Sequence, residues 1–125
     1  MTEQDFRSYV AAFNAGDFDG FGRFYADNVV FELGSAMRLE GRDAILDFYR
    51  EVKAHIDEVV TPLDVIVAPT RIAMHCRTSF DCFRDWPEFA IRPVEAGERW
   101  VVETIAMYEI VDDRFTHIRG ARFKP

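Results

Sequence analysis

The chain has 125 residues, of which 49% are hydrophobic and 14% aromatic, and its formal net charge is −7. This length is enough for one core and too short for two, and the apolar content excludes a disordered chain, so we predict a single domain over residues 1–125. Because the negative charge repels phosphate backbones and anionic lipid, nucleic acid and membrane surfaces are poor candidate partners.

Two helices are predicted near the N-terminus. The first begins at a capping box, Thr2-Glu3-Gln4-Asp5, and ends at Gly16. Asp17 can cap the second, which is short. The apolar residues that follow these caps at helical spacing are Phe6, Tyr9, Val10 and Phe13 in the first helix and Phe18, Phe21, Phe24 and Tyr25 in the second.

A turn at residues 26–28 leads to a predicted strand over 29–33, and Gly41 opens a longer helix. The apolar stripe of this helix is Ile45, Phe48, Tyr49, Val52 and Ile56. From Thr61 the hydrophobic period changes from 3.6 to 2, and the predicted strands are 63–67, 71–83, 99–111 and 114–123. Helices followed by a meander indicate an α+β domain, with the helices on one face of a curved antiparallel sheet.

Two cysteines, Cys76 and Cys82, lie six residues apart in one predicted strand. At ~3.3 Å per residue they are roughly 20 Å apart, which is beyond the reach of a disulfide. Two free thiols suit a reducing cytoplasm, so we predict a cytoplasmic location. The sequence contains neither a Cys-x-x-Cys nor a His-x-x-x-His pair, and we expect no metal site and no cofactor.

Three strings follow one another: YVAAFNAGDFDGF, FYADNVVFE and GRDAILDFYREV. This pattern resembles the nuclear transport factor 2-like superfamily, which includes ketosteroid isomerase, limonene epoxide hydrolase and the SnoaL-like polyketide cyclases. The resemblance covers essentially the whole chain. It implies a cystatin-like cone in which helices close one end, the concave sheet face lines an apolar cavity and the convex face packs against a second copy, giving a homodimer. The motif is specific for the fold and for no single reaction.

The catalytic acids of two of these families can be sought in this sequence. The resemblance to ketosteroid isomerase matches its hydrogen-bonding helix-one tyrosine to Tyr9. It places Leu33 where that family carries its proton-moving Asp, and Ala106 where it carries a neutral carboxylic acid. The last-strand Asp of limonene epoxide hydrolase falls on Gly120. Because Glu32 alternates with Leu33 along the strand, we expect Glu32 to point out of the cavity.

Strand alternation and the resemblance together predict a mostly apolar ligand cavity. Tyr9 could donate a hydrogen bond to a ligand carbonyl, or be an ordinary core tyrosine. Arg122 could hold a carboxylate or enolate at the mouth, or simply be solvated. The predicted ligand-binding residues are Phe13, Phe31, Leu33, Phe48, Cys76, Thr78, Phe80, Trp86, Trp100, Thr104, Tyr108 and Arg122. The connection 84–98 is either a lid or a packed corner.

The convex face is expected to carry its own titratable cluster, formed by His75, Arg77, Glu103, His117 and Arg119. These residues resemble an acid/base constellation, but they also suit a polar patch between two subunits, which we favour. A β-bulge in the strand 99–111 would turn Glu103 inward and make it the best general base of the chain.

Three functions stay open at this point. The first is a cofactor-free isomerase or cyclase that acts by proton transfer on a small hydrophobic carbonyl compound, with Tyr9 as donor and an unidentified base. The second is a non-catalytic module that binds a small hydrophobic molecule. The third is a structural homodimer whose aromatic side chains fill the cone. The replaced acids at Leu33, Ala106 and Gly120 argue against the two named mechanisms.

Overall fold

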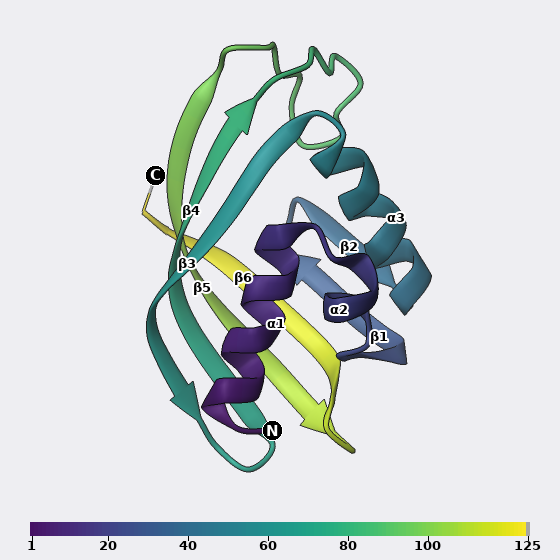
Figure 1. Ribbon diagram of the computed structural model, residues 1–125, viewed down its shortest axis with the longest axis vertical. Helices are drawn as coiled ribbons and strands as arrows, with labels where there is room; N and C mark the ends of the chain where they lie inside the picture. Colours follow the sequence, from purple (N-terminus) through teal and green to yellow (C-terminus); the bar gives the residue numbers. More distant parts are fainter. Residues whose placement is uncertain (125) are drawn as a thin grey trace.

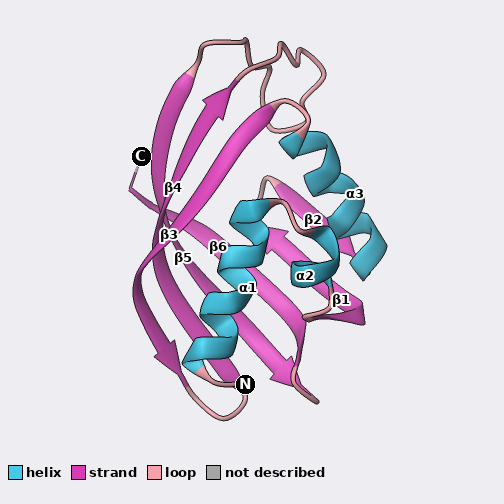
Figure 2. Cartoon of the chain, viewed as in Figure 1, coloured by secondary structure: helices cyan, strands magenta, loops and turns pink. Residues whose placement is uncertain are grey.

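The computed structural model describes residues 1–124, with three helices packed on one side of a six-stranded sheet (Figures 1 and 2). In chain order the elements are α1 (Glu3–Ala15), α2 (Phe18–Gly22), β1 (Tyr25–Leu33), β2 (Met37–Glu40), α3 (Arg42–Lys53), β3 (Ile56–Val67), β4 (Arg71–Cys82), β5 (Arg99–Val111) and β6 (Arg114–Lys124). The α+β class predicted from the sequence is confirmed.

The sheet is curved and unclosed, with strand order β2-β1-β6-β5-β4-β3. Neighbouring strands are antiparallel except β1 and β6, which run parallel. In Figure 1 the long strands β3 to β6 bend around α1, while α3 lies beside β1 and β2. The helices therefore lie on the concave side, and the convex side of the sheet is left without a layer from this chain.

Helix α1 begins and ends as its sequence predicts. Thr2 Oγ1 accepts a hydrogen bond from the Asp5 amide at 3.1 Å, and Asp5 Oδ2 accepts one from the Thr2 amide at 2.9 Å. Gly16 ends the helix at φ 70°, a conformation that glycine adopts without a Cβ clash. The capping box orients α1 so that Phe6, Tyr9 and Phe13 are buried against the sheet.

Three of the strands differ from the sequence prediction by more than one residue. Strand β1 begins at Tyr25 rather than 29, because Tyr25 already pairs with Phe115 across a register shift. The four-residue edge strand β2 was not predicted. Strand β3 begins at Ile56, which the sequence analysis placed on the stripe of the preceding helix. Ile56 is buried, as an apolar residue would be either at the end of the helix or at the start of the strand, so its hydrophobicity alone does not distinguish the two elements.

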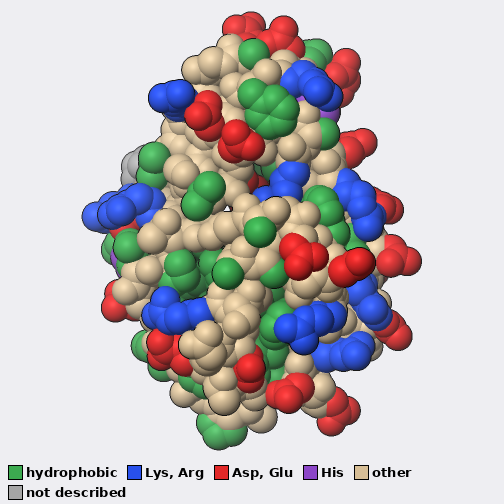
Figure 3. All heavy atoms as spheres, viewed as in Figure 1, with side chains coloured by type: hydrophobic (Ala, Val, Ile, Leu, Met, Phe, Trp, Pro, Cys, Tyr) green, Lys and Arg blue, Asp and Glu red, His purple; other side chains and the backbone are tan. Residues whose placement is uncertain are grey.

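The core has two parts. The larger one lies under α1 and contains Phe6, Tyr9, Tyr25 and Phe115. The smaller one lies at the end of α3 and contains Val52, Ile56, Cys82, Trp86 and Val94, with Phe48 and Phe89 packed against it. Figure 3 shows acidic and basic side chains interspersed on the surface beside these helices, so the net charge is not gathered into one patch on this face.

Candidate functional site

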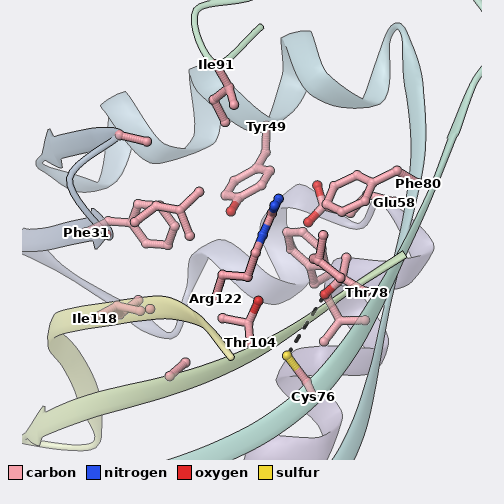
Figure 4. A pocket seen from close by; sticks show the side chains of 18 of the residues that line it. Phe31, Tyr49, Glu58, Cys76, Thr78, Phe80, Ile91, Thr104, Ile118 and Arg122 are labelled. Carbon is pink, nitrogen blue, oxygen red and sulfur yellow. Dashed lines mark hydrogen bonds between the residues drawn. The ribbon is translucent and has the colours of Figure 1, made fainter. Parts of the chain in front are cut away.

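A cavity of about 500 Å³ lies between the concave face of the sheet and the helices (Figure 4). Strands β3 to β6 supply most of its wall, α1 and α3 supply aromatic side chains, and the loop after β4 reaches its mouth. The large aromatic residues thus leave a cavity inside the cone, which does not favour the third function left open by the sequence. The size and mostly apolar lining are those of a small-molecule site.

Strand register brings the cavity side chains together in rows. Glu58 pairs with Phe80, which in turn pairs with Trp100, across β3, β4 and β5. A second row of partners runs from Cys76 through Thr104 to Arg122. Residues paired across neighbouring strands point to the same side of a sheet. The carboxylate of Glu58, from β3, and the guanidinium of Arg122, from β6, therefore enter the same cavity.

All but two of the predicted ligand-binding residues line this cavity. Those that do are Phe13, Phe31, Leu33, Cys76, Thr78, Phe80, Trp100, Thr104, Tyr108 and Arg122, and Tyr9 lines it as well. Phe48 and Trp86 were wrongly placed, because both pack in the smaller core. Trp86 lies between His55 and Phe89, with ring centroids 4.4 Å and 4.1 Å away and nearly parallel planes.

The connection 84–98 has a packed base and a tip that reaches the cavity. Its base is packed: Trp86 forms a bridge with Val94, and the Ala96 amide donates to Asp85 Oδ1 at 2.8 Å. Its tip supplies Phe89, Ile91 and Arg92 to the cavity lining. The loop therefore forms part of the cavity mouth.

Glu58 is the functional candidate that the sequence analysis missed. Its side chain lies in the cavity beside Phe80, and no hydrogen bond or ion pair holds it within residues 1–124 (Figure 4). Burial raises its pKa from the ordinary 4.5 to about 7, and the positive charge of Lys53 offsets part of this rise. The alternation Ile56, Glu58, Val60 was the available signal, because it places Glu58 on the inward face.

Tyr9, Tyr49 and Tyr108 line the same cavity as this carboxylate. Tyr9 and Tyr25 share a hydrogen bond between their hydroxyl groups at 2.9 Å. Burial raises the pKa of Tyr9, Tyr25, Tyr49 and Tyr108 well above its usual value, so these hydroxyls stay neutral and keep their protons for donation. In Figure 4 the Tyr49 hydroxyl points into the cavity, close to the end of Arg122.

Arg122 extends from β6 into the mouth of the cavity. Figure 4 shows its guanidinium between Tyr49 and Glu58. No carboxylate within residues 1–124 lies at ion-pair distance from it, Glu58 included. The other cavity arginine, Arg92, lies 4.5 Å from the centre of the Trp100 ring and 3.6 Å from Glu98. Its charge is therefore already balanced.

Glu103 points away from the cavity. Its carboxylate contacts His75 Nε2 at 3.1 Å and Lys124 Nζ at 3.3 Å. The bulge at this position lies in β6, at Phe123, while the register between β4 and β5 is continuous, so the facing of Glu103 is not reversed. The condition that would have made Glu103 the general base is not met.

Glu32 also lies on the convex face, with its carboxylate 2.6 Å from His117 Nε2 and 3.1 Å from Arg38. The hydrogen bond from His117 is the main cause that lowers the pKa of Glu32. Lys124 acts in the same way on Glu103. The convex acids are thus ion-paired, in contrast to the isolated acid of the cavity.

Among residues 1–124, no cluster of three or more His, Cys, Asp or Glu side chains has the arrangement of a metal site. No helix of residues 1–124 has the length and apolar character required to cross a membrane.

The fold and the cavity define a protein of the nuclear transport factor 2-like class, with a cone and an internal pocket. Within this class the chain belongs to the SnoaL-like domain family, whose model matches residues 6–118. No curated protein matches the chain.

Solved structures share the fold at low sequence identity. A proposed polyketide cyclase from Xanthomonas campestris pv. campestris superposes with a TM-score of 0.82 at 22% identity, covering 94% of this chain and 87% of the other. A limonene-epoxide-hydrolase-like enzyme of M. tuberculosis superposes with a TM-score of 0.77 at 14% identity, covering 95% of this chain and 80% of the other. A protein of Catenulispora acidiphila with a ketosteroid isomerase-like fold, solved with trimethylamine, superposes with a TM-score of 0.75 at 13% identity. The match covers 96% of this chain and 85% of the other. At these identities the likeness establishes the fold and no reaction.

Proposed function

We propose that this protein is a cofactor-free isomerase or cyclase that moves a proton on a small hydrophobic carbonyl compound, with Glu58 as the general base. The observation that carries the proposal is a single unpaired carboxylate inside a mostly apolar cavity. A general base works best when its pKa lies near the operating pH, and burial brings that of Glu58 to about 7. A module that only binds apolar ligands gains nothing from such a group, since burying it costs free energy.

The first chemical step is the removal of a proton from the carbon next to the ligand carbonyl. The Glu58 carboxylate takes the proton, and the electron pair of the broken C–H bond moves onto the carbonyl oxygen, which becomes an enolate. A hydrogen bond from a neutral tyrosine stabilises this oxygen. Tyr9 and Tyr49 both line the cavity and keep their protons.

Two outcomes complete the reaction without any further reagent. In an isomerase, protonated Glu58 returns the proton to a different carbon of the conjugated enolate. In a cyclase, the enolate carbon attacks a second carbonyl of the same molecule, and Glu58 gives its proton to the new alkoxide. Both outcomes restore the Glu58 carboxylate.

The test is the exchange of α-protons for deuterium, followed by NMR in heavy water, with a panel of flat ketones that includes 2-tetralone. We expect the wild type to accelerate exchange, and Glu58→Gln to reduce that acceleration by about 10²–10⁴-fold, the usual contribution of a general base. Glu103→Gln is the matched control and should exchange at the wild-type rate. Equal rates in the wild type and Glu58→Gln, or no acceleration of any ketone that binds, would refute the proposal.

A further inference from the structure

We infer that the natural ligand is a flat, conjugated carboxylic acid whose carboxylate is bound by Arg122. The inference names the substrate class of the cavity and rests on the proposed function for the reacting end of the ligand. The binding of the carboxylate by Arg122 can be measured independently of any reaction.

The position of Arg122 makes it the anion-binding group of the cavity. Its strand partner Thr104 lines the same wall, and Figure 4 shows the guanidinium turned inward instead of along the sheet surface. Two features distinguish it from Arg92: it has no carboxylate partner in the described part of the chain, and it is not stacked on a ring. A free guanidinium offers two parallel N–H donors, which fit the two oxygens of a carboxylate.

Among residues 1–124, several arginines outside the cavity are paired with a carboxylate, while Arg23, Arg77, Arg84 and Arg114 are not. Arg119 precedes Arg122 on the same strand and faces the convex side, where it lies 3.3 Å from Glu109. Arg38, Arg71 and Arg99 likewise have carboxylate partners. The chain has 22 acidic residues against 15 basic ones, so acids are in excess. An arginine at the cavity mouth that takes none of them remains available for an acid that the ligand brings.

The shape of the ligand follows from the wall next to this arginine. The rings of Phe80 and Trp100 are stacked on each other from adjacent strands, with centroids 4.9 Å apart and planes 11° apart. Both rings line the cavity, and an aromatic wall of this kind packs well against a planar conjugated system. Arg92 supports the Trp100 ring from the loop.

Three contacts therefore define the ligand: a carboxylate at Arg122, a flat body against Phe80 and Trp100, and an acidic C–H near Glu58. All three groups line one cavity of about 500 Å³. Aromatic keto acids and small polyketide-derived acids carry all three features. A neutral ketone offers nothing to the guanidinium beyond a single hydrogen bond.

The experiment compares an acid with its neutral ester. Isothermal titration with 2-naphthoate and with methyl 2-naphthoate measures the preference for the carboxylate directly. We expect the wild type to bind the acid at least about tenfold more tightly than the ester, and Arg122→Met to lose that preference. Arg114→Met removes the same charge from the same strand outside the cavity lining, and it should keep the preference.

Equal affinity for acid and ester, a preference that survives in Arg122→Met, or no binding of naphthoate at millimolar concentration would overturn the inference. Glu58→Gln should retain the acid preference, because glutamine keeps the shape of the side chain and removes a negative charge. If the acid preference is found but no ketone exchanges its protons, the proposed function fails and the carboxylate site stands. If protons exchange through Glu58 without an acid preference, the proposed function stands and the carboxylate site fails.

Discussion

The two faces of the long sheet carry similar ionisable residues in opposite electrostatic situations. On the concave face Glu58 has no ion-pair partner within residues 1–124, and its pKa is raised by burial. On the convex face Glu32 and Glu103 contact histidine and a cation, and their pKa is lowered. A carboxylate held by cations is a weak base, whereas a desolvated one takes a proton readily. Isolation from partners, more than the number of acid and base side chains, therefore distinguishes the face on which we propose that the reaction occurs.

The difference between the faces extends to their apolar residues. Val101, Ile105 and Met107 are 53%, 48% and 36% exposed on the convex side of β5, and Val59 and Ile66 are exposed on β3, which β4 separates from β5. An apolar patch with paired charges is typical of an interface between protein chains. The homodimer expected from the sequence stays a prediction, and this surface is where we expect the second copy.

The largest change that we predict is in molecular mass. Ile105→Lys places a charge in the middle of the convex patch, and we expect light scattering to give half the mass of the wild type. Val111→Lys is the control, because Val111 is 58% exposed at the far end of β5 and should not affect association. A wild type that is already monomeric at micromolar concentration would show that the convex face is not an interface between copies.

The second prediction concerns the pH dependence of the proposed reaction. Glu58 acts as a base only when it has lost its proton, and its pKa is about 7. At pH 5 roughly one molecule in a hundred is ionised at this site, so kcat/KM should rise about a hundredfold between pH 5 and pH 8. Glu103→Gln should leave the midpoint unchanged. A midpoint close to the ordinary value of 4.5 would mean that a solvated carboxylate performs the reaction.

Much of this comparison was accessible from the sequence, because strand parity is a strict rule. Once β4, β5 and β6 were placed, alternation assigned Thr78 and Tyr108 to the cavity wall and His117 to the convex face, where the structure has them. Alternation along β1 likewise assigned Glu32 to the convex face. What alternation cannot supply is a partner for each charge, since pairing depends on neighbouring strands and on side-chain reach.

The one decisive residue that was missed lies where two periodicities overlap. Ile56 is four residues after Val52, as on a helix, and two before Glu58, as on a strand. No glycine or proline separates the two elements, so the helical stripe predicted from the sequence runs on through Ile56 and masks the inward position of Glu58. Trp86 was misplaced for a different reason. The path of an irregular loop is set by contacts such as those with His55 and Phe89, which no local period encodes.

The smallest effect that we predict is on stability, and its sign separates the two faces. The pKa of Glu58 is about 7 in the folded protein and close to 4.5 when the chain unfolds. Between these values the unfolded chain has released this proton and the folded protein still holds it, so stability falls as the pH rises through the window. The full difference corresponds to roughly 3 kcal/mol, and access of water to the cavity should reduce it to about 2 kcal/mol.

Glu58→Gln removes this cost, so its melting temperature should exceed that of the wild type by roughly 6–10 °C at pH 8 and match it at pH 4. Glu103→Gln should do the opposite, because the lowered pKa of Glu103 means that its carboxylate stabilises the fold at neutral pH and loses this contribution only in acid. Thermal melts of both variants at the two pH values check this. If both glutamine variants are destabilised at pH 8, the Glu58 carboxylate is held by a favourable contact, and it is not the isolated base of the cavity.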